Sequence, residues 1–246
     1  MQTYCEGKEG SDESVMSVYF SPDDYMEATT YEQVRQNLGL VLYSKEEAAA
    51  SEREADAVFV KEELPGGIFA FLEVLMQDKE GDFYHAPVDT GQVVSETLDI
   101  QELIFDGIDC MSEKLPAVFV NTLDANRNLA TYGDQKFYML HTEAPFGASA
   151  ILFPGVLKNI GERFGCNYFI LPSNRDMMII TPDDRSKDLD SLERTLIEQN
   201  EKLASEQRLS NSVLYYDIVH GRLMTAREAK SNNVTYINEI SNDYVN

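Results

Sequence analysis

The chain has 246 residues, of which 43 are Asp or Glu and 20 are Lys or Arg, so its formal net charge is −23. This balance excludes a protein that binds nucleic acid through bulk charge, because phosphate attraction needs clustered cations. Hydrophobic residues make up 43% of the chain and include 12 Phe and 13 Tyr. The chain can therefore bury one or two cores, which excludes an intrinsically disordered protein.

No apolar run approaches the roughly 18 residues that a membrane-spanning helix needs. Residues 1–10 have neither the basic start nor the apolar stretch of a signal peptide, so we expect a cytosolic protein without a membrane partner. The three cysteines, Cys5, Cys110 and Cys166, are odd in number and widely spaced. That spacing is typical of a reducing compartment and predicts no disulfide framework.

The negative charge is concentrated in the first half of the chain. Residues 1–120 hold 26 acidic and 7 basic residues, a balance of −19, whereas residues 121–246 hold 17 and 13, a balance of −4. Such an asymmetry bears on solubility and on the partners of a protein rather than on its fold.

The first 56 residues predict one strand and two helices. Residues 14–20 (SVMSVYF) read as a strand, and a helix is expected over 22–38 because Ser-Pro-Asp-Asp at 21–24 supplies start signals. Residues 44–56 are rich in Ala and Glu, which favours a helix by propensity. They carry almost no apolar stripe, so we predict a solvated helix.

Two later passages share a pattern. The letters AVFV occur at 57–60 and at 117–120, and each is predicted to open a strand that leads through a second strand to a histidine, His85 or His141. In both passages a glycine lies six residues past the histidine, and an amphipathic helix is expected to follow, over 98–111 and over 148–164. The pattern predicts an internal strand–strand–helix repeat of about 60 residues.

The remainder predicts a third unit of the same kind. Two strands, at 167–172 and 176–181, are joined by a short polar turn, and a leucine stripe predicts a helix that ends near residue 207. A closing strand is expected over 212–219, followed by a short helix and a frayed tail. We therefore predict an α+β fold with a largely antiparallel sheet and helices on one face. Its segments would be 1–56, 57–116, 117–166, 167–230 and 231–246.

The stretch FGASAILFPGVLKNIGERFGCNYFILPSNRDMMIITPDD at 146–184, followed by LSNSVLYYD at 209–217, is a specific pattern. It resembles the C-terminal signature of a family of bacterial proteins described only as a domain of unknown function, common in anaerobic Gram-positive bacteria and their mobile elements. The N-terminal half departs from that family, because residues 44–97 are unusual and strongly acidic. The resemblance implies fold and biological setting but no reaction.

The histidines are the first candidates for chemistry. His85 and His141 hold equivalent places in the apparent repeat, which suits general bases or a metal pair. The alternative is that each is a hydrogen-bonded residue at a strand end, and this is favoured because no carboxylate or Cys stands at ligand spacing in the sequence. His220, before Gly221, reads as a turn residue. We predict no metal, no nucleotide and no other cofactor.

Other motifs are explained by structure alone. Ser149 lacks the flanking glycines of a nucleophile elbow, which predicts a buried small residue at a helix start. Gly66 and Gly67 mark a turn without a phosphate-binding Lys. The polar turn Asn174, Arg175 and Asp176 is explained by turn chemistry, and Cys110, at the end of an apolar helix stripe, is expected to be packed and inert.

The leading hypothesis is a non-catalytic protein whose acidic half engages a basic protein partner, such as one that handles nucleic acid, in the manner of an inhibitor or DNA mimic. The chain length gives a globule roughly 46 Å across, and a DNA duplex of that length carries on the order of 27 phosphates. The charge of −23 is of comparable size. The residues expected to bind the partner are Asp78, Glu80 and Asp82 near a turn, and Glu102, Asp106 and Asp109 on a helix face.

Two alternatives from other classes stay open at this point. The first is a hydrolase that uses His85 or His141 with a neighbouring carboxylate, and the second is a structural accessory module. An acidic ridge on the surface would favour binding, whereas a cleft that holds a histidine and a carboxylate would favour the enzyme.

Overall fold

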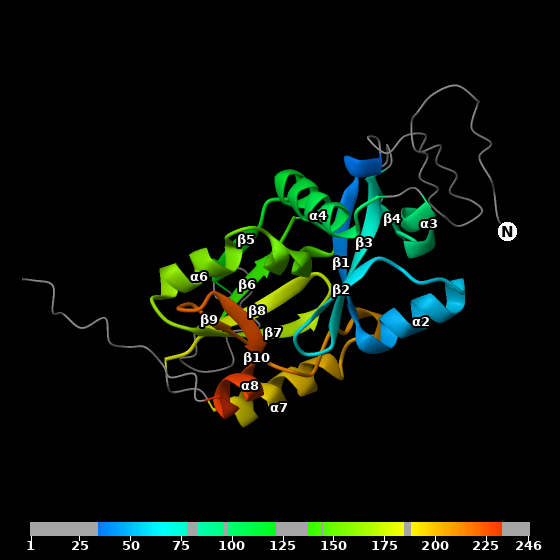
Figure 1. Cartoon of the computed structure of the whole chain (residues 1–246). Coiled ribbons are helices and arrows are strands. Elements are labelled where there is room, and N and C mark those ends of the chain that lie inside the picture. The colour runs from blue at the N-terminus through cyan, green and yellow to red at the C-terminus, as the bar shows by residue number, and fades with distance from the viewer. Residues whose placement is uncertain are drawn as a thin grey trace, which may run out of the picture. The chain divides into compact units, whose positions relative to one another are not determined.

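The computed structural model of the chain describes residues 34–77, 83–95, 98–121, 137–143, 145–184 and 188–232 (Figure 1). The strand predicted at 14–20 and the tail from residue 233 lie outside these ranges. The described residues form two compact units. The first holds those up to Leu64 together with Ile68–Pro116, and the second holds Pro65–Gly67 together with those from Ala117 onward.

The first unit contains an antiparallel sheet with the order β1-β3-β2, in which β4 also pairs with β3. The beginning of β3 pairs with β2 and its end pairs with β4, so β3 is the central strand. The strands are β1 (Leu38–Ser44), β2 (Lys61–Leu64), β3 (Ile68–Gln77) and β4 (Phe83–Pro87).

Strand β1 replaces the end of a predicted helix. The helix expected over 22–38 does not reach its predicted end, because the backbone turns at residues 36–37 and β1 begins at Leu38. All seven residues of β1 are buried. A short continuous apolar run such as LGLVLYS is typical of a strand buried on both faces, and it lacks the polar positions of a surface helix.

Three helices accompany this sheet: α2 (Lys45–Ala55), α3 (Thr90–Ser95) and α4 (Ile100–Lys114). The prediction of a solvated helix at 44–56 is confirmed, since Ala48 is the one buried residue of α2. Ser44 caps the start of α2 by accepting a hydrogen bond from the backbone N–H of Glu47. The predicted helix over 98–111 is also confirmed, as α4.

The second unit contains a six-stranded antiparallel sheet with the order β10-β9-β7-β8-β6-β5. The strands are β5 (Val118–Asn121), β6 (Tyr138–His141), β7 (Tyr168–Asn174), β8 (Met177–Pro182), β9 (Leu214–Asp217) and β10 (Arg222–Thr225). The predicted strand pair at 167–181 is confirmed as the β7–β8 hairpin, and the predicted closing strand is β9. Strand β10 was not predicted, because its four residues alternate too briefly to show a period.

Helices pack on both faces of the second sheet, whereas the sequence predicted one face (Figure 1). Neighbouring side chains on β7 alternate between the faces. The Tyr168 hydroxyl donates to the Leu157 carbonyl of α6 (Val156–Phe164) at 2.8 Å. Phe169 instead belongs to the cluster on the other face, which α7 (Leu189–Asn200) and α8 (Ala226–Ser231) cover.

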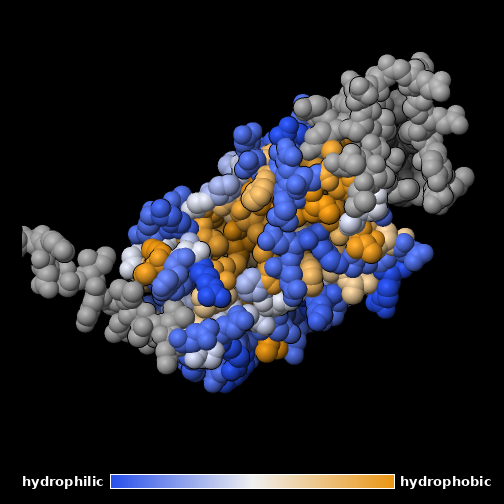
Figure 2. Space-filling model, viewed as in Figure 1, coloured by the Kyte–Doolittle hydropathy of each residue, from blue (hydrophilic) through white to orange (hydrophobic). Residues whose placement is uncertain are grey.

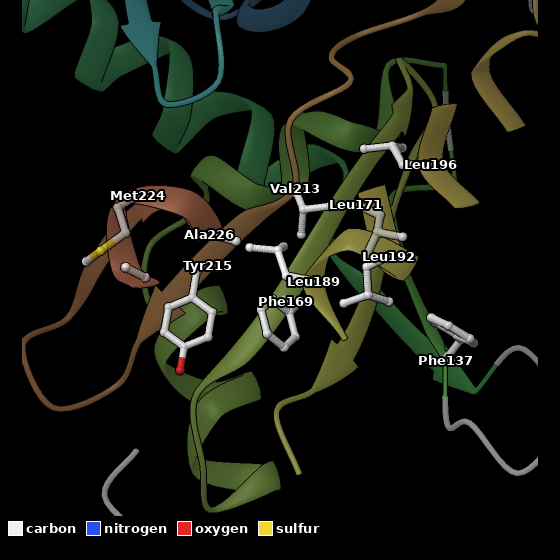
Figure 3. Close-up of a cluster of buried hydrophobic side chains, with 11 residues drawn as sticks. Phe137, Phe169, Leu171, Leu189, Leu192, Leu196, Val213, Tyr215, Met224 and Ala226 are labelled. Atoms are coloured by element: carbon white, nitrogen blue, oxygen red, sulfur yellow. The ribbon is translucent and has the colours of Figure 1, made fainter. Parts of the chain in front are cut away.

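Figure 3 shows this second-face cluster, in which side chains from three strands meet those of α7 and α8. Phe169 and Tyr215 pack with their ring centroids 5.1 Å apart on neighbouring strands. The cluster consists of Phe137, Phe169, Leu171, Leu189, Leu192, Leu196, Val213, Tyr215, Met224, Ala226 and Ala229.

The single helix predicted over 148–164 is wrong. A 3₁₀ helix, η1 (Gly147–Leu152), and α6 form there instead. Pro154 and Gly155 separate them, and Gly155 adopts a positive φ of 76°. Proline lacks the N–H that a continuous helix needs, and a residue at positive φ leaves the right-handed helix. The third predicted helix ends at Asn200, short of residue 207, where the separate turn η2 (Ser205–Gln207) ends.

The internal repeat is visible only in part. Residues 118–121 form β5, which pairs with β6, but residues 57–60 contain one isolated bridge, between Phe59 and Asp89. The two AVFV segments also pair with different positions relative to the histidines. Phe119 lies opposite Leu140, the residue before His141, whereas Phe59 lies opposite Asp89, which comes after His85. The α+β class with antiparallel sheets is confirmed. Within the described ranges, every helix is too short or too polar to cross a bilayer.

Candidate functional site

The position of α4 is fixed by its buried side. Gly107 faces the sheet so closely that an added Cβ would lie 2.7 Å from Leu72 Cδ1 of β3. Leu103, Ile104 and Met111 are buried on the same side. The helix begins at Asp99, whose carboxylate accepts the backbone N–H groups of residues 101 and 102. The opposite side of α4 is therefore held facing solvent.

That opposite side carries three acids and an exposed aromatic side chain. Successive residues of a helix are rotated by about 100°, so Phe105 and Asp109 point away from Gly107, and Glu102 and Glu113 lie next to Asp109 around the helix. All four are exposed, and Phe105 is 63% exposed. We call Glu102, Phe105, Asp109 and Glu113 the α4 face. None of its three acids forms an ion pair with any residue that the structure describes.

The predicted partner-binding residues do not all belong to this face. Asp106 accepts a hydrogen bond at 2.8 Å from the Arg35 guanidinium, and its side chain is only 14% exposed. Asp106 therefore does not face open water as Glu102 and Asp109 do, because the guanidinium of Arg35, in the segment before β1, covers it. Asp78, Glu80 and Asp82 lie outside the described residues.

Acids on α7 in the second unit have a different environment. Arg227 of α8 forms salt bridges with Asp190, at 3.3 Å, and with Glu193. The hydrogen bond that Arg227 donates to the Glu193 carboxylate raises the pKa of Arg227 above its ordinary value. Figure 2 shows a mostly hydrophilic surface over α7 and α8. The α7 surface thus has acids like the α4 face, but a cation already pairs with two of them.

A second feature of the first unit is a carboxylate buried in the sheet. Glu73 in β3 has no exposed surface. Its Oε1 accepts a hydrogen bond of 2.6 Å from the Tyr43 hydroxyl of β1, and its Oε2 lies 2.6 Å from His85 Nδ1 of β4. An ionised carboxylate can only accept, so ionised Glu73 requires the imidazole to carry a proton on Nδ1. Two neighbouring strands thus supply the donors that a buried charge requires.

The strand register explains why Glu73 and His85 meet. Glu73 lies opposite Gly39 on β1, which has no side chain, and opposite Pro87 on β4, two residues from His85. Residues two apart on a strand point to the same face, so His85 lies diagonally across from Glu73. Glu73 is not among the site residues predicted from the sequence, because a single acid in the run IFAFLEVLM interrupts an apolar strand but does not indicate which residue it contacts. That break is the one signal available.

The other histidines have local roles. His141 ends β6 and its Nδ1 lies 2.6 Å from the Thr142 carbonyl, so a hydrogen-bonded strand end describes it well. His220 lies in the β9–β10 turn, where its Nδ1 is 2.6 Å from Asp217 Oδ2. Asp217 Oδ1 also accepts the backbone N–H groups of Val219 and His220, and Gly221 adopts a positive φ of 60°. The turn prediction for His220 is confirmed.

The remaining motifs have the structural roles that the sequence predicts for them. Ser149 is fully buried in η1, as predicted. Asn174 Oδ1 accepts the backbone N–H groups of Asp176 and Met177, both at 3.0 Å, which is turn chemistry. Gly66 and Gly67 adopt positive φ between β2 and β3, and the Ser210 hydroxyl donates to the Gly66 carbonyl.

The two described cysteines are free thiols. Burial raises the pKa of both Cys110 and Cys166, which lowers their thiolate fraction and hence their reactivity. Over the described ranges, no group of three or more His, Cys, Asp or Glu side chains is placed to hold a metal ion.

The sequence comparison gives a family but no activity. Residues 88–218, more than half of the chain, match the Family of unknown function (DUF5688). This span includes α4 and its acidic face as well as the resemblance seen at 146–217. No curated protein and no solved structure matches the chain. The chain belongs to this family of unknown function, DUF5688.

Proposed function

We propose that the protein acts by binding, and that the acidic surface of its first unit contacts a basic protein partner. The observation that carries the proposal is the α4 face, where Glu102, Asp109 and Glu113 are exposed and have no ion-pair partner among the described residues. Charges that a fold does not pair with its own cations are available to a partner's cations.

The expected role of these acids is to speed association. A single exposed ion pair contributes about 0.2–1 kcal/mol, so three such pairs give little affinity alone. A surface of one sign attracts an opposite surface before contact and raises the association rate constant. Because the Debye length falls to about 8 Å at physiological salt, this rate falls as salt is added.

The test compares the two acidic helices. The double variant Glu102→Lys, Asp109→Lys reverses the α4 face, and Glu198→Lys, Glu201→Lys reverses two exposed acids at the end of α7. Glu193 is left unchanged because Arg227 already pairs with it. The immobilised full chain is incubated with lysate of its source organism, and captured proteins are identified by mass spectrometry at low and at physiological salt.

We expect the α4 variant to lose basic proteins that the unaltered chain retains, and the α7 variant to keep them. Capture of those proteins should also fall as salt rises. Equal loss from both variants, or capture that does not change with salt, would contradict the proposal. Circular dichroism of both variants checks that the substitutions leave the helices folded.

The resemblance at 146–217 supports a setting for this activity. We propose a cytosolic protein of a bacterial mobile element or of its host's defence, with a partner that handles nucleic acid and with the chain acting as an inhibitor or DNA mimic. A partner identified by capture tests this directly, because a DNA-binding protein should release the chain when duplex DNA is added.

A second candidate function rests on Glu73 and His85. A buried carboxylate that orients an imidazole through Nδ1 is the arrangement that general-base catalysis uses, with Nε2 as the nitrogen that meets the substrate. We propose hydrolysis as the class of reaction. A set of p-nitrophenyl esters and phosphates tests it, with His85→Gln and His220→Gln as matched variants. Hydrolysis lost in the first variant only would support this function, and no hydrolysis by the unaltered chain would exclude it for these substrates.

A further inference from the structure

Phe105 is the apolar residue of the α4 face and is 63% exposed. A single exposed apolar side chain is common on protein surfaces. Phe105 differs because Glu102 precedes it by three residues and Asp109 follows by four, so both acids are its neighbours on the same side of the helix. An exposed aromatic side chain with acids one turn before it and one turn after it has the composition of a binding hot spot, in which polar groups lie beside an apolar anchor.

The helix that presents Phe105 is rigidly attached. Leu103, Ile104 and Met111 are buried beneath it, and Gly107 contacts β3 directly. At the end of α4, Lys114 donates to the carbonyl of Gln36. A preformed face loses little conformational entropy on binding. The free energy gained from the apolar contact of Phe105 therefore contributes to affinity and is not offset by the cost of ordering the helix.

The length of α4 indicates which kind of partner element could pack along it. The helix has 15 residues and is therefore about 22 Å long. Glu102 and Asp109 are seven residues apart, which is two turns or about 10.5 Å. A partner helix laid along α4 would place cations at the same spacing, and its apolar stripe would supply the hole that receives a protruding ring.

We propose that the partner presents a basic amphipathic helix, which packs along α4 with its apolar stripe on Phe105 and its Lys or Arg residues beside Glu102 and Asp109. This inference rests on the proposed binding function and names its partner's chemistry. It separates helix packing from simple charge mimicry of DNA, because a cationic DNA-binding groove recognises phosphates and gains nothing from an aromatic side chain.

Two synthetic peptides distinguish these modes. The first is an 18-residue Leu/Lys peptide with an amphipathic helical pattern, and the second has the same lysines with Gln in place of Leu. Binding of each labelled peptide to the full chain is measured by fluorescence anisotropy across a salt series. Phe105→Ala removes the ring from the α4 face. Ile197→Ala on α7, a side chain that is 40% exposed, is the matched control.

We expect the Leu/Lys peptide to bind more tightly than the Gln/Lys peptide, and Phe105→Ala to weaken it about tenfold, as truncation of an aromatic hot spot does. Ile197→Ala should leave binding unchanged. If both peptides bind equally and Phe105→Ala has no effect while Glu102→Lys, Asp109→Lys abolishes binding, the helix inference is overturned and charge-based binding stands. If reversal of the acids changes nothing, the proposed function itself fails.

Discussion

The two units place their acids differently, and α4 and α7 make the contrast plain. Each helix buries three large apolar side chains against an antiparallel sheet and carries acids on its exposed side. The buried side chains are Leu103, Ile104 and Met111 on α4, and Leu189, Leu192 and Leu196 on α7. On α7, Arg227 pairs with Asp190 and Glu193. On the α4 face, three acids lie on the same side of the helix as Phe105, and no cation among the described residues pairs with them. Two helices with the same pattern of apolar and acidic residues thus offer different surfaces to a partner.

The buried acids differ in the same way. In the first unit, Glu73 lies in the middle of a sheet and is held by side chains of two neighbouring strands. In the second unit, Asp217 ends β9 and accepts local backbone N–H groups, which is a turn-forming role. A carboxylate at a strand end stabilises the loop beside it, whereas one in a strand centre depends on distant partners. Glu73 is therefore an acid whose burial local structure does not explain.

The largest effects should come from the buried sides of the two helices, where the units are alike. Leu103→Ala in α4 and Leu196→Ala in α7 each remove a side chain that is 1% exposed. Each should cost about 2–5 kcal/mol through lost burial and the cavity left behind. Amide hydrogen exchange measured by mass spectrometry reads each unit separately. We expect each variant to lose protection in the unit that contains its helix. A variant whose own unit keeps full protection would show that this helix is not anchored as described.

A smaller effect should separate the buried carboxylates. Tyr43→Phe removes a donor from Glu73, which has no exposed surface, and should cost about 1–3 kcal/mol for the unsatisfied oxygen. Tyr215→Phe removes the donor to Asp183 Oδ2 in the second unit. We expect it to cost less, because Asp183 lies past the end of β8, whereas Glu73 lies within a strand. Urea unfolding of both variants measures the difference, and equal costs would remove this part of the contrast.

Removing the cation from α7 should make that helix resemble α4. Arg227→Gln releases Asp190 and Glu193 from their salt bridges. We expect the variant to bind the Gln/Lys peptide measurably better than the unaltered chain at low salt, and equally at high salt. Arg194→Gln, which changes the charge by the same amount at an exposed position of α7, is the control for net charge. An equal gain in peptide binding for both variants would show that net charge, rather than the ion pairs of Arg227, determines the binding.

The smallest effect concerns pH at the start of α8. Hydrogen bonds from the hydroxyl and backbone N–H of Thr225 lower the pKa of Glu228 below its ordinary value of 4.5. A lowered pKa means that the carboxylate stabilises the folded state at pH above 4.5, and that this contribution is lost as the pH falls through the lowered value. Protection of α8 amides should therefore decrease below pH 4.5. Glu228→Gln should remove that decrease.

Much of the architecture follows from the sequence alone. Local patterns predicted α2, α4, the β7–β8 hairpin and the start of α7, because propensity, caps and apolar spacing act within a few residues. The same local signals predicted a turn at His220 and a buried Ser149. They also predicted that acids 102 and 109 face away from the apolar stripe of α4, since a helix fixes which residues share a side.

Only the tertiary structure decided which polar groups meet. Glu73 and His85 are 12 residues apart, and Tyr43 lies 30 residues before Glu73, so strand pairing rather than sequence spacing joins them. Arg35 covers Asp106 across 71 residues, and Arg227 reaches α7 across more than 30. A helical or strand period states which face a side chain occupies. It does not state what lies opposite, because that depends on how elements distant in the chain pack together.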